Sequence, residues 1–201
     1  SDIVPLTDEN RVIVKLGLKL VQQTKNLGLK AILQSTGYNK IDSIAISFGV
    51  APRINACGRM GHQEDALNLF LSKDINDVNE LSAKLNQYNK ERQEIEKNIF
   101  AEAVKQIERD NWENNTTITL LGKNWHHGVI GIVASKITEM YYKPSILLCE
   151  EDGIGKGSGR SIPGFDLYET LTECKDSIDR FGGHEMAVGI TIDKEKFEEF
   201  R

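Results

Sequence analysis

The run from Ile75 to Trp112 contains neither glycine nor proline, and this constrains the fold more than any other feature of the sequence. Apolar residues recur in it at alternating spacings of three and four, which is typical of one face of an α-helix. A helix of this length would span about 50 Å, too long to be buried inside one small domain. We therefore expect a long helix that connects two parts of the fold. The stripe consists of Val78, Leu81, Leu85, Tyr88, Ile95 and Ile99, with Arg92 at one further position.

A coiled-coil dimer is the alternative interpretation of this run. The number of heptads is small, however, and an arginine in the apolar stripe weakens the seam between two helices. We therefore favour a connecting helix in a monomer.

Composition limits the partners and the compartment. The chain has 201 residues, of which 39% are hydrophobic, so it can bury a core as one large domain or two small ones. Its formal net charge of −5 gives no general attraction to nucleic acid, so DNA binding would require local basic clusters. Three cysteines without Cys-x-x-Cys spacing argue against a disulfide framework and a zinc knuckle. No apolar run reaches membrane-spanning length. We expect a cytoplasmic protein with reduced thiols and no membrane partner.

The first 74 residues predict a mostly helical segment. Thr7 is the expected N-cap of a helix that reaches Gly28, and a second, shorter helix is expected over 29–34. Apolar residues in 41–48 fit either a strand or a helix, and we favour the helix. Residues 63–71 predict one more amphipathic helix.

Beyond residue 114 the pattern changes to alternating strands and helices, which predicts a small α/β domain with a mixed sheet. The expected fold is therefore α/β: a helical segment over 1–74, a long connecting helix over 75–113, and the mixed-sheet domain over 114–201. The chain starts without methionine and stops within an apparent helix, so we expect a piece of a longer protein. The expected strands are 116–121, 145–149, 156–161 and 188–192, and the expected helices are 129–140, 167–178 and a terminal one.

The string Ala-Pro-Arg-Ile-Asn-Ala-Cys-Gly-Arg over residues 51–59 is the most specific in the chain. Pro52 and Gly58 argue against a regular helix throughout it. Such a turn could present Arg53 and Arg59 to phosphate groups. In the alternative interpretation, both arginines form structural pairs with carboxylates.

A glycine-rich stretch from Gly155 to Gly189 is the second candidate site. Closely spaced glycines let backbone N–H groups approach an anion, and Arg160 beside Ser158 can offer a guanidinium and a hydroxyl to a phosphate. Asp166 is the expected cap of the helix that follows. The alternative is a loose β-hairpin that begins at the Asp-Gly pair of residues 152–153.

Three residues at the end of this stretch, Gly182, Gly183 and His184, add to the phosphate-binding hypothesis. In the alternative, the glycine pair stops a helix and His184 packs at the start of one. His126 and His127 could form a metal site, but adjacent histidines on an extended segment point apart, so contact with substrate or packing is favoured.

These motifs resemble the DHH phosphoesterase superfamily and, within it, the RecJ family of single-strand-specific exonucleases. The resemblance spans nearly the whole chain. The matching strings are Asp-Ile-Val-Pro-Leu over 2–6, Pro-Arg-x-Asn-Ala-x-Gly-Arg over 52–59, Leu-Asn-x-x-Asn-x-x-Arg over 85–92, Trp-His-x-Gly-Val-Ile-Gly over 125–131, and the Gly-Gly-His box.

The resemblance implies the end of a DHH catalytic domain, a connecting helix and a DHH-associated domain. It implies degradation of single-stranded DNA from the 5′ end, in repair and recombination, with two Mn²⁺ or Mg²⁺ ions held by Asp and His. Asp2 matches the last carboxylate ligand of that metal site. Arg59, Ser158 and Arg160 match positions that grip the DNA backbone or the 5′ phosphate.

No Asp-His-His triplet occurs in the chain, and one carboxylate cannot hold a metal pair. We therefore expect no stable metal binding and no nuclease activity from this chain alone. Two alternatives remain open: another DHH phosphodiesterase that acts on short oligonucleotides or cyclic dinucleotides, and a non-catalytic nucleic-acid-binding module.

Overall fold

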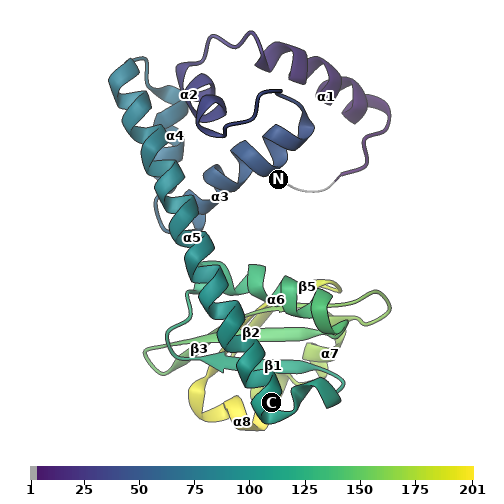
Figure 1. The fold of residues 1–201 in the computed structure, drawn as a ribbon. Helices are drawn as coiled ribbons and strands as arrows, with labels where there is room; N and C mark the ends of the chain where they lie inside the picture. The colour runs from purple at the N-terminus through teal and green to yellow at the C-terminus, as the bar shows by residue number, and fades with distance from the viewer. Residues whose placement is uncertain (1–3) are drawn as a thin grey trace. The chain divides into compact units, whose positions relative to one another are not determined.

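The computed structural model describes residues 4–201, and the chain divides into two compact units, residues up to 92 and residues 93–201 (Figure 1). The first of these, the N-terminal unit, is helical. The boundary between the units falls within the longest helix, α5. The helices are α1 (Asp8–Val21), α2 (Leu27–Ser35), a π-helix (Ala45–Val50), α3 (Ala51–Arg59), α4 (Gln63–Leu71) and α5 (Ile75–Asp110).

The helix α5 confirms the prediction made from the run without glycine or proline. It has 36 residues and is continuous. Leu85 and Val78 are fully buried on its apolar stripe. They pack in the core of the N-terminal unit with residues of the π-helix and of α2, α3 and α4. That core comprises Ile32, Leu33, Val50, Cys57, Ala66, Leu69, Val78 and Leu85.

The expectation of one helix as far as Gly28 is wrong, because α1 ends at Val21 and α2 begins at Leu27. The Asn26 side chain caps α2 by accepting a hydrogen bond from the Leu29 N–H at 2.8 Å. Gly28 lies inside α2, where a Cβ atom would stand 1.9 Å from the Leu69 carbonyl oxygen. Glycine is therefore required there by close packing between α2 and α4, not by a helix end.

The segment after residue 41 is helical, as favoured from the sequence. Asp42 Oδ1 accepts hydrogen bonds from the Ile44 and Ala45 amides, both at 3.0 Å. The expectation that residues 51–59 cannot form a regular helix is wrong, since they form α3. Pro52 lies in its first turn, where a missing N–H costs little, and Gly58 lies in its last turn.

The C-terminal unit, residues 93–201, contains a five-stranded mixed sheet in the order β1-β2-β3-β5-β4. The pair β1–β2 is parallel and the other pairs are antiparallel. This confirms the α/β fold class. The strands are β1 (Ile118–Gly122), β2 (Ser145–Glu151), β3 (Ile154–Arg160), β4 (Arg180–His184) and β5 (Ala187–Asp193), and the helices after α5 are α6 (His127–Tyr141), α7 (Leu167–Glu173) and α8 (Phe197–Phe200).

Two local features of this unit follow from the sequence. The turn between β2 and β3 has positive φ at Asp152 (52°) and Gly153 (80°), which fits a two-residue hairpin. Asp166 Oδ1 caps α7 by accepting from the Glu169 N–H at 2.9 Å. The helix expected over 167–178 is shorter, because a one-turn 3₁₀ segment follows α7.

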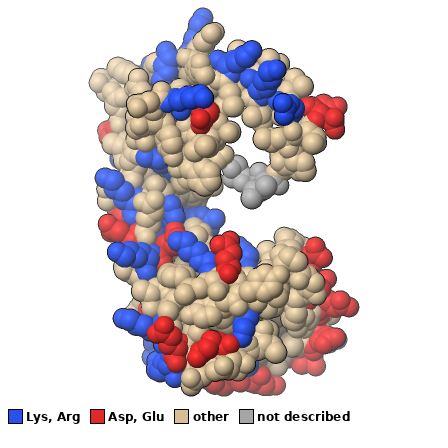
Figure 2. Space-filling model, turned by 45° about the vertical axis from the view of Figure 1, so that its right-hand side comes forward, with Lys and Arg blue, Asp and Glu red and all other residues tan. Residues whose placement is uncertain are grey.

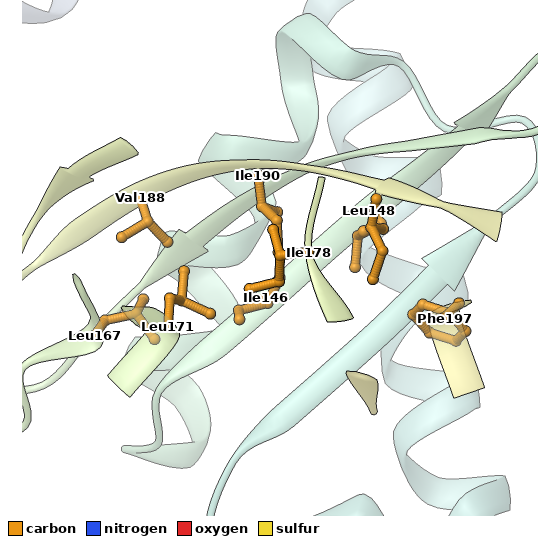
Figure 3. Close-up of a cluster of buried hydrophobic side chains, with 9 residues drawn as sticks. Ile146, Leu148, Leu167, Leu171, Ile178, Val188, Ile190 and Phe197 are labelled. Atoms are coloured by element: carbon orange, nitrogen blue, oxygen red, sulfur yellow. The ribbon is translucent and has the colours of Figure 1, made fainter. Parts of the chain in front are cut away.

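One face of the sheet packs on α7 and α8 around a continuous hydrophobic cluster (Figure 3). The opposite face packs on α6. Within residues 4–201 no helix is both long and apolar enough to cross a membrane. The cluster in Figure 3 comprises Ile146, Leu148, Leu167, Leu171, Ile178, Val188, Ile190, Ile192 and Phe197.

Candidate nucleic-acid interface

The strand β3 separates the glycines of the candidate site from its polar side chains. Successive residues of a strand point to opposite faces of the sheet, so Gly155, Gly157 and Gly159 lie on the face of the hydrophobic cluster. A Cβ atom at Gly157 would stand 2.3 Å from Ile190 Cγ2, and one at Gly159 would stand 2.6 Å from Val188 Cγ2. These glycines make room for large apolar neighbours.

The backbone of β3 pairs with β2 on one side and with β5 on the other. Its N–H groups therefore donate hydrogen bonds to the neighbouring strands. The hypothesis that the amides between Gly155 and Gly159 approach an anion is wrong. The hairpin interpretation is correct for the backbone. It also places Ser158 and Arg160 together on the face opposite the cluster.

Arg160 and Ser158 form a hydrogen-bonded pair beside α6. Arg160 Nη1 donates to Ser158 Oγ at 2.9 Å and to the Gly159 carbonyl oxygen at 2.7 Å. A Cβ atom at Gly131 of α6 would lie 3.0 Å from Ser158 Oγ and 3.1 Å from Arg160 Nη2. Because α6 presents a glycine here, the guanidinium and the hydroxyl can lie against it without a clash.

The register of β3, β5 and β4 extends this pair into an open face of the sheet. Gly182 and Gly189 are exposed, and a Cβ atom at Gly182 would meet no atom within 4 Å. The floor therefore consists of small residues that let a ligand approach the backbone closely. We call the following set the open face: a first row of Arg160, Ala187 and His184, and a second row of Ser158, Gly189 and Gly182.

His184 ends β4 on this face, so the alternatives of a helix stop and a helix start are both wrong for the Gly-Gly-His string. His184 Nδ1 accepts a hydrogen bond from the Met186 N–H at 3.3 Å. In the neutral ring the proton is therefore on Nε2, where it can be donated to a phosphate oxygen. Gly183 has φ of 148°, and a Cβ atom there would stand 2.2 Å from the Ala187 carbonyl oxygen. Only glycine fits that position.

An ion-pair cluster lies on the same side of the sheet at the start of α6. Glu151 accepts from Lys156 Nζ at 2.7 Å and from His127 Nδ1 at 3.0 Å. The rings of His126 and His127 stack at 5.2 Å between centroids, so the expectation that they point apart is wrong. His126 is the N-cap of α6 and His127 its first residue, rather than parts of an extended segment. Burial and the neighbouring His127 lower the pKa of His126.

The ion pairs of Glu151 lead us to expect that the stability of the fold depends on pH. Hydrogen bonds from Lys156 and then from His127 lower its pKa from 4.5 to about 2. A carboxyl group whose pKa is lowered by folding stabilises the fold at pH values above its pKa in the unfolded chain. This contribution is lost as the pH falls through its pKa in the folded protein. The loss is expected between these two values and is small, because the pair is solvent-exposed. An NMR titration of the side-chain carboxyl carbon should give a midpoint near the lower value that rises in Lys156→Ala. A wild-type midpoint at the ordinary value would contradict the ion pair.

In the N-terminal unit, Arg53 has structural partners. Its Nε donates to Asn86 Oδ1 at 2.5 Å, its Nη1 to the Gly49 carbonyl oxygen at 2.6 Å, and its Nη2 to the Ser35 carbonyl oxygen at 3.4 Å. These partners are amide and backbone oxygens rather than carboxylates. Burial lowers the pKa of Arg53. Arg59 lies at the end of α3 and is exposed.

The residues needed for a metal pair are not found in the described part of the chain. Asp2, the expected ligand, lies outside the described residues. Among residues 4–201 no group of three or more His, Cys, Asp or Glu side chains is arranged to hold a metal ion. The described residues therefore do not fit a metal centre of their own.

The sequence interpretation did not select three residues that lie on this face of the sheet or against it: Gly131, Lys156 and Arg180. A signal for Lys156 exists in the sequence, because it alternates with Ser158 and Arg160 and so shares their face of β3. Arg180 could not be placed without the register of β4 against β5. Gly131 could not be placed without knowing which strand α6 covers.

Comparisons with known proteins indicate the family of this chain. Residues 113–201 match the DHHA1 domain family. Over its whole length the chain is 42% identical to the single-stranded-DNA-specific exonuclease RecJ of Bacillus subtilis (strain 168) and covers 26% of that protein. It is 35% identical to RecJ of Dickeya dadantii (strain 3937) and covers 37% of it.

Solved structures give the same result. The crystal structure of RecJ from Thermus thermophilus in complex with Mg²⁺ matches 99% of this chain with a TM-score of 0.89 and 33% identity, over 31% of that chain. An exonuclease RecJ bound to manganese matches with a TM-score of 0.87 and 34% identity, over 49% of that chain. The chain thus spans about a quarter to two fifths of the length of its curated relatives. It belongs to the RecJ family of the DHH superfamily, and residues 113–201 form its DHHA1 domain.

Proposed function

We propose that the open face binds the sugar-phosphate backbone of single-stranded DNA, and that the whole protein is a 5′-to-3′ exonuclease. The observation that carries this proposal is the hydrogen-bonded Arg160–Ser158 pair at the border of an exposed floor of glycines. A guanidinium, a hydroxyl and the His184 ring can all donate to phosphate oxygens. Donors of this kind read no base, so they suit an exonuclease that accepts any sequence.

Charge distribution supports a local rather than a general attraction. Figure 2 shows basic and acidic side chains interspersed on the visible surface, in keeping with the net charge of −5. The open face, in contrast, carries donors and no carboxylate in its two rows. DNA is therefore drawn to this face by a small set of specific contacts.

The whole protein, in this proposal, is a cytoplasmic monomer that hydrolyses phosphodiester bonds in DNA repair and recombination. Relatives have been solved with Mg²⁺ and with Mn²⁺. Two such ions, held by residues other than 4–201, would supply hydroxide and stabilise the phosphoryl charge. Residues 1–74 belong to the catalytic DHH domain, 75–113 connect, and 114–201 bind DNA. Arg59 contributes a further phosphate contact from the N-terminal unit. Since no group of three or more His, Cys, Asp or Glu side chains within residues 4–201 could hold a metal ion, the role proposed for these residues is binding.

A chimera tests this proposal. The matching segment of Bacillus subtilis RecJ, which is 42% identical, is replaced by this chain. The chimera is expected to degrade single-stranded DNA from a 5′ end with Mn²⁺, whereas this chain alone binds a labelled single strand and releases no nucleotides. Digestion by the chain alone would show that it holds a complete catalytic centre. A folded, inactive chimera that has also lost DNA binding would overturn the exonuclease assignment.

A further inference from the structure

We propose that the open face continues into a second phosphate-binding subsite formed by Lys156, Thr191 and Arg180. The inference rests on the proposed function and extends it. The register pairs Lys156 with Thr191 and Thr191 with Arg180, so these residues form a third row across β3, β5 and β4. Their side chains lie on the same face as Arg160, Ser158 and His184, because each is an even number of positions away along its strand.

The spacing of the rows fits a chain of phosphates. Residues two positions apart on a strand are separated by about 7 Å, so the third row lies about 13 Å from the row of Arg160. The exposed glycines Gly182 and Gly189 form the row between them. A single strand that lies along β3 would therefore meet donors at both ends of a smooth floor.

The chemistry of the third row suits a phosphate. Lys156 and Arg180 are exposed, and the Arg180 guanidinium has no ion pair or hydrogen bond with residues 4–201. Thr191, half-buried between them, adds a hydroxyl. An ammonium, a hydroxyl and a guanidinium in one row provide donors to a phosphate from three strands. The row lacks a base-reading aromatic platform, so its ligand is the backbone phosphate.

Glu151 competes for this subsite. Its carboxylate holds Lys156 at 2.7 Å, so a phosphate must share or displace that ammonium. Glu151→Gln keeps the shape of the side chain and removes its charge. It should therefore release Lys156 and strengthen DNA binding, whereas loss of Lys156 or Arg180 should weaken it.

The chain provides a matched control. Lys194 Nζ pairs with Glu150 Oε1 at 2.6 Å, a geometry like that of Lys156 and Glu151. Glu150 precedes Glu151 on β2, so its side chain lies on the opposite face of the sheet. Lys194→Ala removes the same charge from the domain without touching the open face.

Affinities for a long 5′-phosphorylated oligothymidylate and for a 5′-phosphorylated dinucleotide are measured in the full chain over a range of salt concentrations. Lys156→Ala and Arg180→Ala should each weaken the long strand about tenfold. Each should also reduce the slope of log affinity against log salt by about 0.7. The dinucleotide can occupy only one subsite, so Lys156→Ala and Arg180→Ala should leave its affinity for the first row unchanged. Lys194→Ala should bind the long strand with the affinity and salt slope of the wild type.

The outcomes separate this inference from the proposed function. If Arg160→Ala weakens the long strand while Lys156→Ala and Arg180→Ala leave its affinity and salt slope unchanged, the second subsite is refuted and the first remains. If Arg160→Ala has no effect either, the open face does not bind DNA. Weaker binding by Glu151→Gln would contradict the competition for Lys156.

Discussion

Replacing Arg160 with alanine is expected to weaken binding of a 5′-phosphorylated single strand by roughly ten- to a hundredfold, which corresponds to about 1.5–3 kcal/mol for hydrogen bonds to a charged group. Arg160 Nη1 already holds Ser158 Oγ at 2.9 Å, so the substitution also frees the hydroxyl to rotate. The lysine variant keeps the charge but loses the planar fork. Its affinity should therefore fall between those of the wild type and Arg160→Ala.

A comparison of strands with different 5′ ends shows which phosphate Arg160 contacts. If it pairs with the terminal phosphate, a 5′-phosphorylated strand must lose more affinity than a 5′-hydroxyl strand. Arg109, which is exposed and pairs with Asp110 at 2.7 Å, provides a control arginine in the same unit. Both strands are titrated, at one fixed salt concentration, against the wild type, Arg160→Ala, Arg160→Lys and the control variant Arg109→Ala. Equal losses on the two strands would make Arg160 a general backbone contact, and no loss on either would refute the Arg160–Ser158 pair as a phosphate site.

The elements that could be predicted from sequence are those whose signal is local. The long helix α5 follows from an uninterrupted stripe at helical spacing, and α4 follows from a short one that ends where expected, at Leu71. The strand β4 could not be predicted in this way. Its sequence, Arg-Phe-Gly-Gly-His, has one apolar residue and two glycines, and four of its five residues are exposed at the edge of the sheet. A strand without a buried face leaves no alternating pattern.

The glycines show why site chemistry was harder to predict than fold. Gly157 is required by Ile190, which lies 33 positions later, and Gly28 is required by the Leu69 carbonyl on another helix. In both cases glycine is required by a residue that is distant in sequence. From the sequence alone, Gly157 was therefore interpreted as part of a phosphate-binding stretch and Gly28 as a helix end. Arg53 is similar, since its partner Asn86 comes from α5. Ser158 and Arg160, in contrast, were selected from sequence because a hydroxyl beside a guanidinium suits a phosphate, and their spacing of two places them on one face of β3.

Replacing Leu85 with proline is expected to destabilise the N-terminal unit by more than any other substitution proposed for this chain. Proline in a helix interior removes a backbone hydrogen bond and clashes with the preceding turn, at a cost of about 3 kcal/mol or more. Leu85 is also fully buried, and loss of a buried leucine side chain costs about 2–5 kcal/mol. Since domains are stable by only about 5–15 kcal/mol, the combined loss should unfold most of the core around Leu85.

Two further variants separate the backbone effect from the side-chain effect. Leu85→Ala leaves the helix intact, so it should cost only the packing contribution. Ile75→Pro places proline at the first position of α5, where no intrahelical N–H bond is lost, and should be nearly neutral. Hydrogen exchange then reports which amides lose protection. In Leu85→Pro the amides of α5 near Leu85 should exchange rapidly, while those of β3 should stay protected, because the hydrophobic cluster on that sheet is formed by residues from 146 onward. A thermal melt of Leu85→Pro that equals the wild type would show that α5 is not a continuous helix in solution.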